Sequence, residues 1–209
     1  MASPLQQTRE WFQSRVGCLT ASQAKDVLAR SKTNGKPLKG YYNLIEKLIT
    51  ERLTGEPVSF GMSPAMQWGV DHEDEARTRY EDETGELVDL VGFIPHPSIE
   101  MFGASPDGFV GENGLVEIKC PNTLTQLQYI KAGVVPEEYK AQMQVQLLCT
   151  GRKWVDFVSY DPRIQGDYER FQFWTIRYEP TEEELKDTER KCVEFLEEVE
   201  AEMAKLLEM

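Results

Sequence analysis

The stretch that decides the fold spans residues 103–121 and reads GASPDGFVGENGLVEIKCP. It places Asp107 after a Ser-Pro pair, then a glycine-rich turn, then an apolar strand that carries a glutamate and a lysine. Side chains alternate between the two faces of a strand, so Glu117 and Lys119 share one face. The GENG turn predicts a hairpin that brings Asp107 back beside Glu117.

Two carboxylates brought together repel each other unless a proton or a cation lies between them. Hard oxygen ligands without His or Cys favour Mg²⁺, with Mn²⁺ as a second possibility. A lysine beside a metal-bound water suits metal-assisted hydrolysis of a phosphodiester. The alternative is a surface hairpin with an exposed Glu–Lys pair. A calcium loop is excluded, since a twelve-residue loop starting at Asp107 would need oxygen ligands at Phe109, Gly111 and Ile118.

The composition is that of one globular domain. The chain has 209 residues, of which 40% are hydrophobic and 28% charged. No apolar run approaches the roughly 18 residues that a membrane span requires, and the N-terminus lacks the pattern of a signal peptide. The four cysteines show no paired spacing, which indicates reduced thiols in a cytoplasm.

The charge is unevenly distributed along the chain. The net charge is −13, which by itself argues against a nucleic-acid partner. Residues 1–52 nevertheless hold nine Lys and Arg against four Asp and Glu, whereas residues 179–209 hold four against twelve. The positive end is therefore where a polyanion could bind. The acidic tail can also be a solvated helix with no consequence for binding.

The pattern of apolar residues predicts an α/β domain with a central mixed β-sheet flanked by helices. We expect one domain over residues 1–209, with a helical N-terminal part at about 1–62 and an acidic helix at about 181–208. Expected helices cover residues 8–17, 20–29, 41–55, 63–85, 123–133, 136–151 and 181–207, and expected strands cover 86–95, 100–105, 114–120, 153–161 and 171–179. A capping box at Thr20 and Gln23, Ser-Pro at 63–64 and Gly85 indicate helix ends.

Six ordered blocks make the sequence similar to a known family. They are WFQSRVGCLTAS, WGVDHEDEAR, SPDG, LVEIKCP, YKAQMQVQ and SYDPR. Together they resemble the phage lambda exonuclease family, also called YqaJ-type viral recombinases, of the PD-(D/E)xK nuclease superfamily. The resemblance runs from about Trp11 to the C-terminal helix. It implies a restriction-endonuclease-like PD-(D/E)xK core. It also implies that the helical part at about 1–62 binds DNA ends and that the protein acts in a bacterial host cytoplasm.

The resemblance also implies a catalytic site. The motif acids Asp107 and Glu117 would bind two metal ions, with the carbonyl of Ile118 as another ligand. Lys119 would be the motif lysine, and Glu73 would complete the site from a helix. Glu73 also falls on the inner face of its expected helix, where a carboxylate needs a partner. Arg77, one turn on, is the alternative to a metal as that partner.

A pocket for a 5′-terminal phosphate is implied in the same way. The matching positions are Arg15, Ser22, Ser105 and Gln142, and a guanidinium with nearby hydroxyls suits a phosphate. Arg15 can equally be an ordinary surface arginine. Met66 matches an apolar wedge between terminal base pairs, or is a core methionine.

The loop at residues 30–39 is rich in basic residues. Arg30 and the lysines that follow it could track a duplex backbone, or they could simply be solvated.

The implied activity is that of a Mg²⁺-dependent 5′→3′ double-strand DNA exonuclease. It would release 5′-mononucleotides, leave a 3′ single-stranded overhang and prefer a 5′-phosphorylated end. Relatives form homotrimers and work with a single-strand annealing protein. Three alternatives stay open: a structure- or site-specific endonuclease on the same core, a non-catalytic DNA-end-binding module, and a metal-binding protein without nuclease activity.

Overall fold

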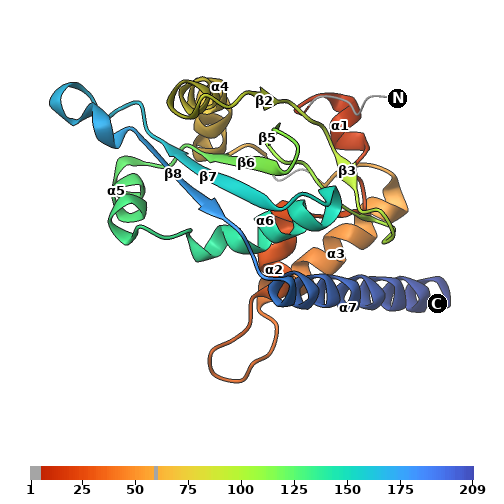
Figure 1. The fold of residues 1–209 in the computed structure, drawn as a ribbon. Helices are drawn as coiled ribbons and strands as arrows, with labels where there is room; N and C mark the ends of the chain where they lie inside the picture. The colour runs from red at the N-terminus through yellow and green to blue at the C-terminus, as the bar shows by residue number, and fades with distance from the viewer. Residues whose placement is uncertain (1–5, 59–60) are drawn as a thin grey trace.

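The computed structural model describes residues 6–58 and 61–209, which form a mixed α/β fold with two sheets (Figure 1). The larger sheet has the order β2-β5-β6-β7-β8, in which only β6 and β7 run parallel. The smaller sheet has the order β1-β4-β3. The strands are β1 (Leu19–Thr20), β2 (Val88–Asp89), β3 (Ile94–Pro95), β4 (Phe102–Ala104), β5 (Gly108–Val110), β6 (Gly114–Lys119), β7 (Trp154–Tyr160) and β8 (Phe173–Tyr178).

The expected hairpin is present. β5 pairs antiparallel with β6, and Gly108 lies opposite Val116, so Asp107 comes next to Glu117 at the end of the ladder. Gly111 turns the chain with φ +53°, a conformation that favours glycine. Gly114 lies under the ring of Trp154, where a Cβ would come within 2.0 Å of a ring carbon. The glycines of the GENG segment therefore set the turn and its close packing.

Helices cover both faces of the larger sheet (Figure 1). Ala76 and Tyr80 of α4 pack on the face that carries Val116 and Ile118. The opposite face, which carries Leu115, packs against α5 and α6. The helices are α1 (Arg9–Gln13), α2 (Ala24–Leu28), α3 (Lys39–Thr54), α4 (Pro64–Thr84), α5 (Thr123–Ala132), α6 (Glu137–Thr150) and α7 (Glu182–Leu207), with 3₁₀ turns η1 (Ala21–Gln23) and η2 (Gly166–Phe171).

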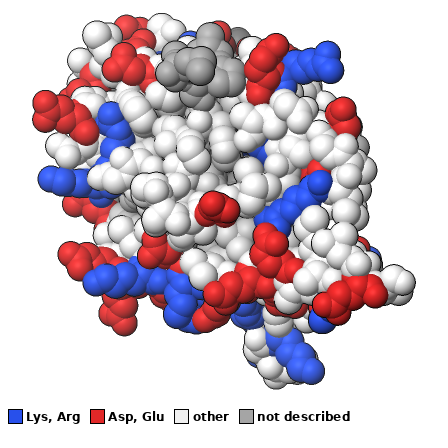
Figure 2. Space-filling model, turned by 90° about the vertical axis from the view of Figure 1, so that its right-hand side faces the viewer, with Lys and Arg blue, Asp and Glu red and all other residues white. Residues whose placement is uncertain are grey.

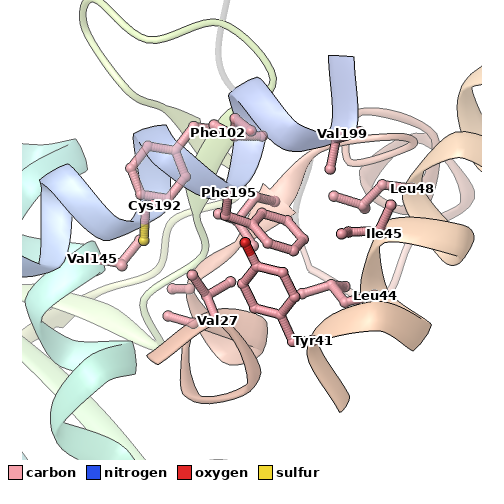
Figure 3. Close-up of a cluster of buried hydrophobic side chains, with 14 of the residues drawn as sticks. Val27, Tyr41, Leu44, Ile45, Leu48, Phe102, Val145, Cys192, Phe195 and Val199 are labelled. Atoms are coloured by element: carbon pink, nitrogen blue, oxygen red, sulfur yellow. The ribbon is translucent and has the colours of Figure 1, made fainter. Parts of the chain in front are cut away.

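A second core joins the N-terminal helices to α7, as Figure 3 shows. Tyr41 of α3 and Phe195 of α7 meet edge to face, with ring centroids 4.9 Å apart. Val27, Val145 and Phe102 bring α2, α6 and β4 into the same cluster. The apolar face of the acidic helix is therefore buried, and its charged face is left to solvent.

The predicted helix ends are confirmed. Ser63 accepts a hydrogen bond from the N–H of Met66, Pro64 follows in the first turn, and Gly85 ends α4 with φ +73°. The Thr20–Gln23 capping box is also present. All four cysteines carry free thiols. Residues 1–5 and 59–60 of the expected N-terminal part lie outside the described residues.

Two expected elements are shorter than predicted. The helix expected over residues 8–17 ends at Gln13, because the Ser14 hydroxyl donates to the carbonyl of Trp11 and competes with the helical pattern. The strand expected over 86–95 reduces to β2 and β3, and Leu87 before β2 and Leu90 after it are exposed. Across residues 6–58 and 61–209, no helix is both long enough and apolar enough to cross a membrane.

Candidate active site

Glu117 lies near the end of β6, and its carboxylate is fully buried. Lys119 donates from Nζ to Oε1 of Glu117, as expected for two residues on one face of a strand. The side chain of Lys119 is 27% exposed, so its amine lies at the border between this buried carboxylate and solvent. Burial alone would lower the pKa of Lys119, but the attraction of Glu117 and Asp107 outweighs it and raises the pKa. The amine is therefore a cation at neutral pH.

Helix α6 forms one wall of the site. Gln142 donates from Nε2 to Oε1 of Glu117 over 2.6 Å, and Gln146 donates from Nε2 to Oε2 over 2.5 Å. The amine of Lys119 lies 5.2 Å from the ring centroid of Tyr139, one turn before Gln142. Both oxygens of Glu117 are thus held by side chains of one helix face.

Asp107 stands where the hairpin prediction placed it. Its Oδ2 accepts a hydrogen bond from the N–H of Ile118 over 2.6 Å, which fixes the carboxylate beside the motif strand. Burial raises the pKa of Asp107 well above its usual value, and repulsion from Glu117 and Glu73 adds to the shift. The three acids therefore interact, although they come from a loop, a strand and a helix.

Glu73 reaches the site from α4, which packs on the opposite face of β6. Burial raises the pKa of Glu73, and the nearby Glu117 raises it further. Arg77, the alternative partner for this carboxylate, forms its ion pair with Asp74 over 2.8 Å instead. Glu73 therefore lies close enough to Glu117 for the two carboxylates to repel each other, and Arg77 acts on it as a nearby positive charge.

Hydrogen bonds from residues that follow Glu73 hold α4 against the sheet. The hydroxyl of Tyr80 donates to Oδ2 of Asp156 over 2.7 Å, and Asp156 is also bound by Arg177 through two nitrogens. The hydroxyl of Tyr160 donates to Oε1 of Glu75 over 2.7 Å. Two tyrosine–carboxylate contacts between α4 and β7 thus fix the helix that presents Glu73.

The donor set suits a hard cation, although the carboxylates are engaged by other groups. In residues 6–58 and 61–209, no group of three or more His, Cys, Asp or Glu side chains is arranged to hold a metal. The cause is visible at Glu117, whose two oxygens are already bound by Lys119 and two glutamines. Burial raises the pKa of Cys120 to about 12, so its thiol is neutral beside the acids. Carboxylates without imidazole or thiolate are the chemistry of Mg²⁺.

A candidate anion pocket adjoins this site. The guanidinium of Arg15 lies 3.9 Å from the ring centroid of Trp11, and Trp11 donates from Nε1 to Oγ of Ser105 over 3.0 Å. Ser105 precedes Asp107 by two residues. The contact through Trp11 therefore brings the predicted pocket residues Arg15 and Ser105 together beside the acids.

The environment of Arg15 favours an anionic ligand. Burial lowers the pKa of Arg15 to about 10, against the attraction of Glu51, so the guanidinium is charged yet poorly solvated. Its buried Nε has no hydrogen-bond partner in the described part of the chain. The turn after it is held by α3, because Glu51 accepts from the N–H of Gly17 and Arg52 donates to the Gly17 carbonyl. A fixed, desolvated cation is suited to a phosphate.

Ser22, Met66 and Arg30 make hydrogen bonds with other parts of the chain, and Gln142 lies at the acids instead of the anion pocket. Ser22 is exposed and lies 3.4 Å from the hydroxyl of Thr20. Met66 is 58% exposed, which excludes its reading as a core methionine. Arg30 is exposed and donates to the carbonyls of Val27 and Ala29 at the base of the basic loop. Gln142, predicted for the phosphate pocket, contacts Glu117 instead of Arg15.

Sequence reasoning missed Gln146, Tyr139 and Trp11. The sequence pattern could have pointed to Gln146 and Tyr139. Residues 139, 142 and 146 lie at helical spacing, in a segment whose other face is apolar. A polar stripe on a buried helix indicates a polar neighbour. Trp11 gave no such signal, since its contacts with Arg15 and Ser105 join segments 94 residues apart.

Comparisons with known proteins identify the family of the chain. Residues 10–153 match the YqaJ-like viral recombinase domain. An alkaline exonuclease from Laribacter hongkongensis is 44% identical, with 96% of this chain and 97% of that chain covered and a TM-score of 0.87. Its complex with dAMP aligns at 45% identity over 95% and 96% of the two chains, with a TM-score of 0.87. A search of curated proteins found no match.

A more distant structure supports the fold alone. A phage-related exonuclease from Haemophilus somnus 129PT is 15% identical over 91% of this chain and 96% of that chain, with a TM-score of 0.66. A mixed sheet between helices, with Asp107, Glu117 and Lys119 at the end of one hairpin, defines the PD-(D/E)xK class of fold. Within that class, the chain belongs to the family of YqaJ-like viral recombinases.

Proposed function

We propose that this protein is a Mg²⁺-dependent 5′→3′ exonuclease of double-stranded DNA, which releases 5′-mononucleotides and leaves a 3′ overhang. The observation that carries the proposal is the meeting of Asp107, Glu117 and Lys119 at one end of the β5–β6 hairpin, with Glu73 coupled to them from α4. The 44% identity to an exonuclease over nearly the whole chain supports the same activity.

Three carboxylates and one backbone carbonyl would hold two Mg²⁺ ions. Asp107 and Glu117 would supply the central oxygens, Ile118 its carbonyl, and Glu73 a further carboxylate. Bound Mg²⁺ would supply an acidified water and a counter-charge for the leaving oxygen. Mn²⁺ would fit the same oxygens. Lys119, released from Glu117, would orient the attacking water with its ammonium group.

The anion pocket would give the enzyme its polarity. Arg15 would bind the 5′-terminal phosphate, with Ser105 beside it and Ser22 and Gln142 as further donors. Because Ser105 and Asp107 are two residues apart, a phosphate held there lies close to the acids. The exposed side chain of Met66 would part the terminal base pairs, and Arg30 with the basic loop would contact the backbone.

The product and partners follow from the same assignment. The related alkaline exonuclease forms a complex with dAMP, which is the kind of mononucleotide that end digestion releases. We propose a homotrimer around the duplex, acting with a single-strand annealing protein that takes the overhang.

An end-labelled duplex tests the activity and its direction together. A linear duplex labelled at either end is incubated with Mg²⁺, and labelled mononucleotide is followed in time. We expect early release of the 5′ label and late release of the 3′ label, because digestion starts at the 5′ phosphate. Early 3′ release, or no release by the wild-type protein, would contradict the proposal.

A closed circular duplex tests the competing endonuclease. The related fold alone permits either activity, but a pocket for a terminal phosphate requires a free end. We expect the covalently closed circle to stay intact under conditions that digest the linear duplex. Nicking or linearisation of the circle would favour the endonuclease.

A further inference from the structure

The buried amide of Gln146 has no role in the assignments above, although it contacts the central acid. Gln146 is fully buried on α6, and its Nε2 donates to Oε2 of Glu117 over 2.5 Å. The carbonyl oxygen of the same amide is buried without a hydrogen-bond partner in residues 6–58 and 61–209. An apolar side chain of the same shape would avoid leaving that acceptor unpaired. The role of the amide therefore lies in its Nε2 group, which donates a hydrogen bond to Glu117.

The two oxygens of Glu117 differ in what binds them. Oε1 accepts from Lys119 and Gln142, which both reach partly exposed positions at the mouth of the site. Oε2 accepts from Gln146, which is sealed from solvent. A cation or a DNA end entering the site can exchange places with the first two donors. A cation or a DNA end cannot reach the third donor, Gln146, unless α6 separates from β6.

From this asymmetry we infer that Gln146 is a positioning residue, which fixes Oε2 of Glu117 from behind and so presents Oε1 to a divalent cation. The inference rests on the proposed function. Gln142 and Lys119 leave Oε1 when the cation binds, and both are then free for phosphate and water. Gln146 keeps its bond throughout, so the buried carboxylate neither rotates nor loses its last donor. Outer hydrogen-bond partners of this kind set metal affinity.

Helix α6 supplies a matched control for the test. Gln144 is also buried, two residues from Gln146, and its amide bonds to the hydroxyls of Tyr178 and Thr188. Neither contact involves the candidate site. Gln146→Met and Gln144→Met therefore remove the same amide from the same helix and keep a similar volume, but only one of them reaches Glu117.

The experiment measures Ca²⁺ binding by calorimetry in the absence of DNA, for wild type and both variants. We expect Gln146→Met to weaken Ca²⁺ affinity by about 10-fold or more, and Gln144→Met to leave it unchanged. In DNA digestion, Gln146→Met should need more Mg²⁺ for half-maximal rate, and its rate should recover as Mg²⁺ is raised. Equal Ca²⁺ affinities for the two variants would overturn the inference, whatever their thermal stabilities.

The outcomes separate the inference from the function on which it rests. If the wild-type protein binds no Ca²⁺ and releases no nucleotide, both the proposed function and the inference fail. If it does both and the two variants behave alike, only the role of Gln146 fails. Should Gln146→Met not fold, Gln146→Leu replaces it.

A measurement on the wild type needs no variant. In ¹⁵N NMR, added Ca²⁺ should shift the side-chain amide of Gln142 strongly while the amide protons of Gln146 keep their slow exchange with solvent. Exchange at Gln146 as fast as at Gln142 would also overturn the inference.

Discussion

At the scale of single residues, Glu117 and Lys119 compensate each other's charge. The buried carboxylate needs a counter-charge, and the amine supplies it from two residues along the same strand face. The attraction raises the pKa of Lys119, so it acts as a donor and not as a base at neutral pH. This ion pair determines the effect that we expect when the Lys119 amine is removed.

Lys119→Met should lower the rate of nucleotide release by about 10²- to 10⁴-fold, the range for loss of one positioned proton-handling group. Far-UV circular dichroism should be unchanged, because Glu117 keeps the donors of Gln142 and Gln146. Lys153→Met, on an exposed lysine just before β7, is the control and should digest DNA normally. A Lys119 variant with the wild-type rate would remove the amine from the mechanism.

Arg15→Ala should reduce the preference for a 5′-phosphorylated end over a 5′-hydroxyl end by about 10-fold or more, since a charge-assisted hydrogen bond contributes about 1.5–3 kcal/mol. The reason is the desolvated guanidinium stacked on Trp11 beside Ser105. Digestion rates on the two substrates give the ratio. Arg9→Ala, on an exposed arginine of α1, should leave the ratio unchanged. An unchanged ratio in Arg15→Ala would mean that the phosphate binds elsewhere.

The sequence alone predicts only part of this site. Asp107 and Glu117 were predictable as neighbours, because a short hairpin sets which residues face each other. The bond from Gln142 to Glu117 was not, because it depends on how α6 docks on β6. The link from Arg15 through Trp11 to Ser105 was equally hidden, since local patterns carry no information on contacts between distant segments.

At the scale of elements, α4 is the helix whose placement matters most, because it carries Glu73. Tyr80 anchors the helix, because its side chain is fully buried and its hydroxyl donates a hydrogen bond to Asp156 of β7. The helix ends could be predicted from Ser63, Pro64 and Gly85, which act locally. The anchor could not, since Asp156 lies 76 residues away.

Tyr80→Phe should lower the free energy of unfolding by about 1.5–3 kcal/mol, the cost of one lost hydrogen bond to a charged group. Asp156 keeps its two bonds from Arg177, so the loss should stay in this range. Urea titration measures it. Tyr42→Phe, on a tyrosine that is 51% exposed, should have no measurable effect. Equal stabilities of the two variants would show that the Tyr80 bond does not anchor α4.

His96 joins the segment after β3 to α7, and its contacts predict a dependence of stability on pH. Its Nδ1 accepts from the N–H groups of Ser98 and Ile99, and its Nε2 contacts Glu189 over 3.2 Å. Burial lowers the pKa of His96 against the attraction of Glu189. A lowered pKa in the folded state means that the unfolded state takes up the proton first. The stabilisation is therefore present above the unfolded pKa of about 6.5 and is lost as pH falls through the folded value.

The measurement compares urea unfolding at about pH 7.5 and about pH 5, on either side of the usual titration range of histidine. Wild type should lose more stability between the two than His96→Asn, which has no proton to gain. Identical losses in the two proteins would show that His96 does not contribute to the pH dependence.

At the scale of the whole molecule, charge is segregated along the chain but mixed on the surface. On the face shown in Figure 2, acidic and basic side chains are interspersed around a largely uncharged centre. The segment between α2 and α3 projects from the body and carries Lys32 and Lys36 at exposed positions (Figure 1). A net charge of −13 therefore does not prevent local contact with a polyanion.

Replacing Lys32, Lys36 and Lys39 together with Ala should weaken binding of duplex DNA and flatten its salt dependence. If each lysine neutralises one phosphate, the slope of log affinity against log salt should fall by up to about 0.9 per lysine. Binding is measured with Ca²⁺ in place of Mg²⁺, because Ca²⁺ fits oxygen ligands but is not held in the strict geometry of Mg²⁺. The same replacement at Lys186, Lys191 and Lys205 of α7 is the control. Equal slopes for both variants would exclude the loop from DNA contact.

The central claim is that Glu73, Asp107 and Glu117 gather around divalent cations at the end of the β5–β6 hairpin. Anomalous diffraction from crystals grown with Mn²⁺ and a 5′-phosphorylated duplex tests it most directly. The account predicts Mn²⁺ at about 2 Å from oxygens of Asp107 and Glu117, with Lys119 withdrawn from Glu117 and the terminal phosphate at Arg15. Manganese bound elsewhere, with Lys119 still on Glu117 and the DNA end away from these acids, would contradict it.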